Sequence, residues 1–100
     1  MTSIYDRLSQ ALRELLEAER IKAHVNQTEF ANRVGLTQPT ISKIEKGDRY
    51  IMAAEIVVFF EALDLDPLKM LKKAMVQAKA GMSVRKPQAR KVKRRATKPK

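Results

Sequence analysis

Polar and basic side chains gather on one face of the segment 38–46, and they could make hydrogen bonds without any covalent chemistry. This face consists of Gln38, Pro39, Ser42, Lys43 and Lys46. At the helical repeat of 3.6 residues, Ile41 and Ile44 point the opposite way, so we expect a short helix with its apolar side on a core. Amide, hydroxyl and ammonium groups are the donors and acceptors that base edges and phosphates need. The segment is therefore a candidate nucleic-acid contact.

The residue types disfavour catalysis and metal binding. The 100-residue chain has no cysteine and one histidine, His24, which excludes a thiol nucleophile and a cysteine-based zinc site. No nucleophile–base pair and no glycine-rich phosphate loop is recognisable. We therefore expect no enzyme, no cofactor and no metal. His24 itself is expected to lie in a loop.

Two short helices must position the polar face. Asn26 with Glu29 three residues later is typical of a helix start, and Gly35 is a natural end for that helix. Thr37 is the next N-cap candidate, and Gly47 ends the second helix. Two helices joined by a short turn that contains glycine predict a helix-turn-helix.

The remaining apolar pattern is also helical. Leucines and alanines recur three and four residues apart after Ser3, and a second apolar run extends from Met52 to Leu63. Asp66 and Pro67 form an N-cap and first-turn pair for a last helix that reaches about Ala78. No strand pattern or hairpin signal occurs, so the prediction is an all-α domain of five helices.

Charge divides the chain into two parts. Residues 1–78 carry 11 Lys and Arg and 11 Asp and Glu, whereas residues 79–100 carry ten Lys and Arg and no acid. The whole net charge of +10 therefore falls in the last 22 residues, which hold too few apolar side chains to offset the entropy of ordering. We expect a globular domain at 1–78 and a disordered basic tail at 79–100.

The tail is expected to bind DNA without sequence preference. The residues that would contact phosphates are Arg85, Lys86, Arg90, Lys91, Lys93, Arg94 and Arg95. Each neutralised phosphate adds about 0.9 to the steepness with which the logarithm of the affinity falls against the logarithm of the salt concentration. The tail could therefore dominate affinity while adding little specificity. Two alternatives stay open, a segment that folds on a protein partner and a solubilising extension.

The motif resembles a known family. The runs 26–31, 35–38 and 41–47, together with 62–67, are similar to the lambda-repressor-like, XRE-type (Cro/cI) helix-turn-helix. The resemblance implies a five-helix DNA-binding domain followed here by the tail, and a homodimer on a palindromic operator in double-stranded DNA. Pro39, where the family often has a polar residue, and the segment 48–52 depart from the family pattern.

The resemblance also implies residue roles. Base contacts fall on Gln38, Pro39, Ser42 and Lys43. Phosphate contacts fall on Gln27 and Thr40. Apart from the resemblance, the basic residues Lys46 and Arg49 on either side of Gly47 are further candidates for phosphate contacts. Arg20 and Glu45 occupy the positions of a buried structural ion pair.

We therefore expect a cytoplasmic, nucleoid-associated transcriptional regulator, and more specifically a repressor, with no membrane segment. One alternative is an antitoxin that binds both DNA and a partner toxin. The other is a non-specific nucleoid protein in which the tail does most of the binding.

Overall fold

The computed structural model describes residues 3–80, and within this range the chain forms five α-helices and no strand. The helices are α1 (Ile4–Lys22), α2 (Gln27–Val34), α3 (Gln38–Lys46), α4 (Ala53–Glu61) and α5 (Pro67–Ala80). The predicted all-α, five-helix architecture is confirmed. Residues 81–100, which make up nearly all of the expected tail, lie outside the described residues, and α5 continues two residues past its predicted end at Ala78.

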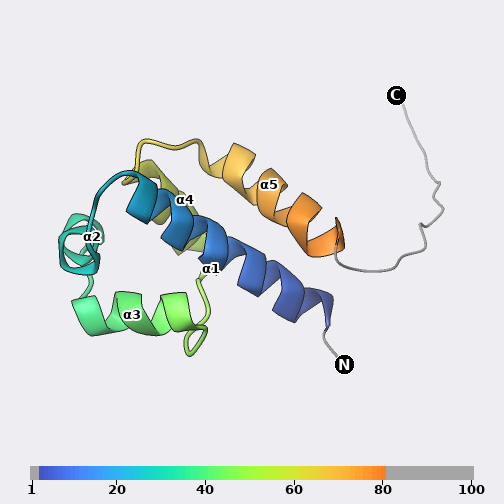
Figure 1. Cartoon of the computed structure of the whole chain (residues 1–100), viewed down its shortest axis with the longest axis horizontal. Helices are drawn as coiled ribbons and strands as arrows, with labels where there is room; N and C mark the ends of the chain where they lie inside the picture. The colour runs from blue at the N-terminus through green and yellow to red at the C-terminus, as the bar shows by residue number, and fades with distance from the viewer. Residues whose placement is uncertain (1–2, 81–100) are drawn as a thin grey trace.

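The longest helix, α1, lies at the centre of the arrangement (Figure 1). It packs against α5 along one side and against α3 on another, and α2 packs on α3. α1 and α5 run antiparallel, so the start of α1 and the end of α5 lie at the same end of the pair (Figure 1). This frame holds α3 at the edge of the molecule.

Side-chain caps start the first three helices where the sequence predicts them. Oxygens of Ser3, Asn26 and Thr37 each accept a hydrogen bond from the backbone N–H three residues later, at 3.1, 2.8 and 3.4 Å. These bonds satisfy N–H groups that have no partner within the helix. Gly35 and Gly47 end α2 and α3 with φ angles of 77° and 88°, a region that glycine enters without steric cost.

α4 begins without a capping side chain at Met52, as its sequence suggests, but Glu55 supplies the missing partner. The Glu55 carboxylate accepts a hydrogen bond from the Met52 backbone N–H at 2.9 Å. The helix ends at Glu61, earlier than the apolar run predicts, because Asp64 turns the chain with a φ of 61°. The Leu65 N–H then returns to the Phe60 carbonyl at 2.9 Å, which closes the turn.

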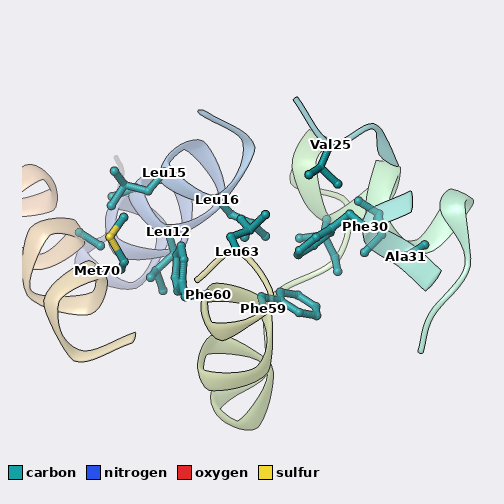
Figure 2. Close-up of a cluster of buried hydrophobic side chains, with 14 of the residues drawn as sticks. Leu12, Leu15, Leu16, Val25, Phe30, Ala31, Phe59, Phe60, Leu63 and Met70 are labelled. Atoms are coloured by element: carbon teal, nitrogen blue, oxygen red, sulfur yellow. The ribbon is translucent and has the colours of Figure 1, made fainter. Parts of the chain in front are cut away.

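The core joins all five helices. Its fully buried large side chains are Leu16, Phe30, Ile41, Ile44, Phe59 and Phe60. Phe30 of α2 and Phe59 of α4 meet edge to face, with ring centroids 5.6 Å apart (Figure 2). Met70 carries the core onto α5, beside Leu15 of α1 (Figure 2). Because Ile41 and Ile44 of α3 are part of this core, the opposite face of α3 must point to solvent.

Candidate nucleic-acid interface

The turn between α2 and α3 sets the position of α3. Gly35 takes the left-handed conformation, and the Leu36 N–H donates to the Ala31 carbonyl at 2.9 Å, which closes the end of α2. Leu36 packs against the core, and Thr37 then caps α3. Each of the three linking residues therefore has a structural task, and the angle between the two helices is fixed by them.

α3 has two distinct faces. Ile41 and Ile44 have no exposed surface. The side chains on the other face are solvent-exposed apart from Ser42, which is half-buried; they are Gln38, Pro39, Ser42, Lys43 and Lys46. The structure therefore brings the four predicted base-contacting residues and Lys46 to one exposed surface. A helix presented in this way fits the width of a DNA major groove.

Gln38 and Gln27 lie side by side and are joined by a hydrogen bond. The Gln38 Nε2 donates to Gln27 Oε1 at 2.7 Å, and the Gln27 Nε2 donates to Glu45 Oε1 at 2.8 Å. Gln38 keeps its own carbonyl oxygen and its second N–H hydrogen for a ligand, the pair of groups that matches adenine N6 and N7. The predicted base contact is therefore held in position by the predicted phosphate contact.

Glu45 connects this series of hydrogen bonds to the interior of the domain. It receives Arg20 Nε at 2.7 Å and Arg20 Nη2 at 3.0 Å, while Arg20 Nη1 donates to the Val25 carbonyl at 2.7 Å. Both charged residues are buried, with 8% of each exposed. The hydrogen bonds with Glu45 raise the pKa of Arg20 above its ordinary value. A continuous set of bonds thus runs from α1 through Glu45 and Gln27 to the exposed Gln38.

Thr40 lies in the first turn of α3 and is half-buried. Its hydroxyl is 2.9 Å from the hydroxyl of Thr37, and the two can exchange donor and acceptor roles. A hydroxyl with one neighbour keeps capacity for a further bond. The expectation that Thr40 contacts a phosphate stays a prediction.

Arg49 is engaged within the protein. Its Nη1 and Nη2 donate to the two carboxylate oxygens of Glu55 at 2.9 and 2.8 Å, and Nη1 also donates to the Tyr50 carbonyl at 2.9 Å. These bonds raise the pKa of Arg49, and the bond from Arg49 lowers the pKa of Glu55. A phosphate would have to share the guanidinium with Glu55, and the predicted phosphate contact of Arg49 stays a prediction.

Arg13 of α1 lies beside α3 and was not singled out from the sequence. A Cβ placed on Gly47 would be 2.9 Å from Arg13 Cζ, so the guanidinium packs directly on the glycine. Together with Ser9 and Tyr50, these residues line a small hollow at the end of α3. The signal available in the sequence is spacing, because Arg13 and Arg20 are seven residues apart and so share one face of α1.

Two further findings apply to residues 3–80. No helix there is both long enough and apolar enough to cross a bilayer. Among the same residues, no cluster of three or more His, Asp or Glu side chains could hold a metal ion. The predicted tail contacts, from Arg85 to Arg95, lie outside the described part of the chain.

Comparison with known proteins bears on the motif as a whole. A family profile described as helix-turn-helix matches residues 16–70, more than half of the chain. The match begins within α1 and extends into α5, so it includes both helices of the motif and the core beneath them. No curated protein was found to match the chain.

Proposed function

Because the chain belongs to the XRE-type, lambda-repressor-like helix-turn-helix family of DNA-binding transcriptional regulators, we propose that it binds a specific palindromic operator as a homodimer and represses transcription. The observation that carries the proposal is the exposed face of α3. Gln38, Ser42 and Lys43 project from a helix whose other side is locked into the core. Such a helix can enter a major groove without rearrangement of the domain.

Gln38, Lys43 and Pro39 complement different base edges. The Gln38 amide suits adenine, because it can donate to N7 and accept from N6. The Lys43 ammonium suits the N7 and O6 acceptors of guanine, and Pro39 can contact a thymine methyl group. Gln27, Thr40 and Lys46 border this face and would anchor the helix on phosphates, which fixes register without reading sequence.

The homodimer is supported by apolar side chains that the domain leaves uncovered. They lie on α4, where Val57 and Val58 are each 47% exposed. A second copy that covers this face would remove apolar surface from water, which favours association.

Repression is the simplest consequence of such binding. Occupancy of DNA that overlaps a promoter is sufficient to exclude polymerase, and it needs no surface beyond the one that binds the operator. Two copies related by two-fold symmetry would place their α3 helices in successive major grooves about 34 Å apart.

In vitro selection from a random duplex library tests the proposal with the full-length chain. We expect an enriched inverted repeat whose half-sites are about one helical turn apart. The control is the Gln38→Ala, Ser42→Ala, Lys43→Ala variant, which keeps the basic residues 67–100 and should still bind DNA but enrich no sequence. Enrichment of the same sequence by this variant would contradict the assignment of α3, and binding without any enrichment by the natural chain would favour the non-specific alternative.

The selected sequence then serves a second experiment. Placed across a promoter in a transcription reaction with purified polymerase, it should make transcription fall as protein is added. A rise in transcription would contradict repression and leave DNA binding intact.

A further inference from the structure

Within residues 3–80, positive charge that no nearby acid in the same helix balances is concentrated on α5. Residues 3–66 carry eight Lys and Arg and eleven Asp and Glu, a net charge of −3. α5 carries four lysines and no acid; they are Lys69, Lys72, Lys73 and Lys79. All four are exposed, and none forms an ion pair with another residue in the range 3–80. α5 is thus the most basic surface of the domain.

The α3 side of the domain is less basic by comparison. On α3 itself, Lys43 and Lys46 are the exposed cations. The half-buried Arg13 packs on Gly47 at the end of α3, whereas the nearby Arg49 is paired with Glu55 and Arg20 is paired with Glu45. Among residues 3–80, the α3 side therefore holds three cations outside ion pairs, Arg13, Lys43 and Lys46, against four on α5.

The lysines of α5 point away from α3. Met70, Ala74 and Ala78 are the buried residues of α5, and α5 packs on α1. At 3.6 residues per turn, all four lysines fall on the half of the helix opposite Ala74. Because α1 runs between α3 and α5 (Figure 1), this lysine face and the α3 face look out from different sides of the molecule.

We propose that the lysine face of α5 is a second DNA-binding surface, independent of sequence, that holds a separate duplex while α3 occupies the operator. This inference rests on the proposed function for the first duplex. The protein would then bridge two DNA segments.

The dimensions and the chemistry of the face fit duplex DNA. The ten residue-to-residue steps from Lys69 to Lys79 rise about 15 Å along the helix axis. One DNA strand presents a phosphate about every 3.4 Å of its axis, so about four phosphates fall within that length. Lysine offers a single, flexible point charge without the planar donor pair of arginine, which suits phosphates and gives little discrimination between sequences.

The sequence beyond α5 has the same character. Residues 81–100 add nine Lys and Arg and no acid, so the chain from Pro67 onward carries 13 positive charges without a negative one. A long uniform run of cations favours a polyanion, which DNA is.

A capture experiment with the full-length chain tests the proposal. The enriched operator duplex is immobilised and saturated with protein, and a fluorescent duplex of unrelated sequence is added in solution. We expect capture of the second duplex by the natural chain. The variant with Lys69, Lys72, Lys73 and Lys79 replaced by Gln should capture it at least fivefold less, with a flatter salt dependence. The matching Lys→Arg variant should keep capture, because it keeps the charge.

The outcomes separate the two proposals. Undiminished capture by the Gln variant, with thermal unfolding unchanged, would overturn the inference. An equal loss of affinity for the operator itself would also overturn it, because the lysines would then contact the same duplex as α3. Binding of the first duplex is scored separately by its dependence on Gln38 and Lys43. If that dependence is absent the proposed function fails, and the Gln variant is then compared with the natural chain on a single unrelated duplex, where equal affinities would overturn a DNA role for α5.

Discussion

Arg20 of α1 and Glu45 of α3 form a two-bond ion pair, at 2.7 and 3.0 Å, beneath the exposed face of α3. The pair joins residues that are 25 positions apart in sequence, so it fixes one helix on the other. Glu45 Oε1 also accepts a hydrogen bond from Gln27 Nε2 at 2.8 Å. The orientation of the exposed amides therefore depends on a charge pair that no ligand can reach directly.

Replacing Glu45 by Gln should destabilise the domain strongly. The change leaves the Arg20 charge buried without a counter-charge, and such losses are about 3–5 kcal/mol. Urea unfolding measures the difference. The control is Glu29→Gln, which breaks the exposed pair with Arg33 and should change stability by less than about 1 kcal/mol. A loss below about 1 kcal/mol for Glu45→Gln would show that the pair does not hold the helices together.

The ion pair between Arg49 and Glu55 should make stability depend on pH. The folded state lowers the pKa of Glu55, so its contribution is complete above the unfolded pKa of about 4.3 and is lost as the pH falls through the lower folded value. Glu55→Gln should reduce the unfolding free energy at pH 7 by about 1–2 kcal/mol. The difference from the natural chain should shrink at pH values below 4.

Glu61→Gln serves as the control for that comparison, because Glu61 is exposed on the same helix and forms no ion pair within residues 3–80. Thermal unfolding across the pH range measures both variants. A Glu55→Gln difference that is constant from pH 7 to pH 3 would contradict the assigned role.

The two turn glycines should respond differently to alanine. Gly35 has free space around its Cα, so Gly35→Ala should cost only the left-handed conformation, about 1 kcal/mol. Gly47→Ala carries a similar cost. It must also displace the Arg13 guanidinium, because the new Cβ would be 2.9 Å from Arg13 Cζ. In an Arg13→Ala background the two costs should become equal. Urea unfolding of the four variants measures this, and an unchanged gap would show that Arg13 is not the obstacle.

His24→Gly should stabilise the chain. His24 ends α1 with a φ of 61°, a conformation in which a non-glycine residue is strained. Relief of that strain exceeds the added freedom of the unfolded state, and we expect a gain of about 0.5–1 kcal/mol. Ala23→Gly is the matched control, because Ala23 has a right-handed φ of −82° and should lose stability. Equal effects of the two changes would contradict the explanation.

Lys43 and Lys46 should differ in their effect on DNA binding. Lys43→Ala should change the preference at one operator position by about 1–3 kcal/mol. Lys46→Ala should weaken binding on all sequences alike and reduce the salt slope by about 1. Titrations against the selected operator and single-base variants measure both. Uniform weakening by Lys43→Ala would reassign that residue to a phosphate.

Helix starts and turns were predictable because the residues that make them are local. Asn26 and Thr37 cap their own helices, and Gly35 and Gly47 take the left-handed angles that their type allows. The two faces of α3 were predictable from the helical repeat, because this repeat places the apolar Ile41 and Ile44 on the side opposite the polar residues. These features need information from at most a few neighbouring residues.

Other features depend on the path of the chain. Arg49 pairs with Glu55 only because the loop between α3 and α4 turns back on itself, and no periodicity encodes that path. Arg13 reaches Gly47 across two helices, so the contact depends on how closely α1 approaches the end of α3. The early end of α4 at Glu61 likewise depends on Asp64 adopting a φ of 61°. An aspartate can adopt this conformation but does not require it, so the residue type alone does not predict the turn.

The antiparallel packing of α1 and α5 brings the start of α1 and the end of α5 to the same end of the helix pair, clear of α2 (Figure 1). Near that end, Arg7 and Gln10 of α1 share a hollow with Gln77 and Ala78 of α5. A peptide linker of moderate length could therefore join the two ends, and new termini could be opened in the α4–α5 loop, which lies away from α3 (Figure 1). The domain is on these grounds a suitable starting point for circular permutation, and dyes or fusion partners attached at either end would leave α3 unobstructed.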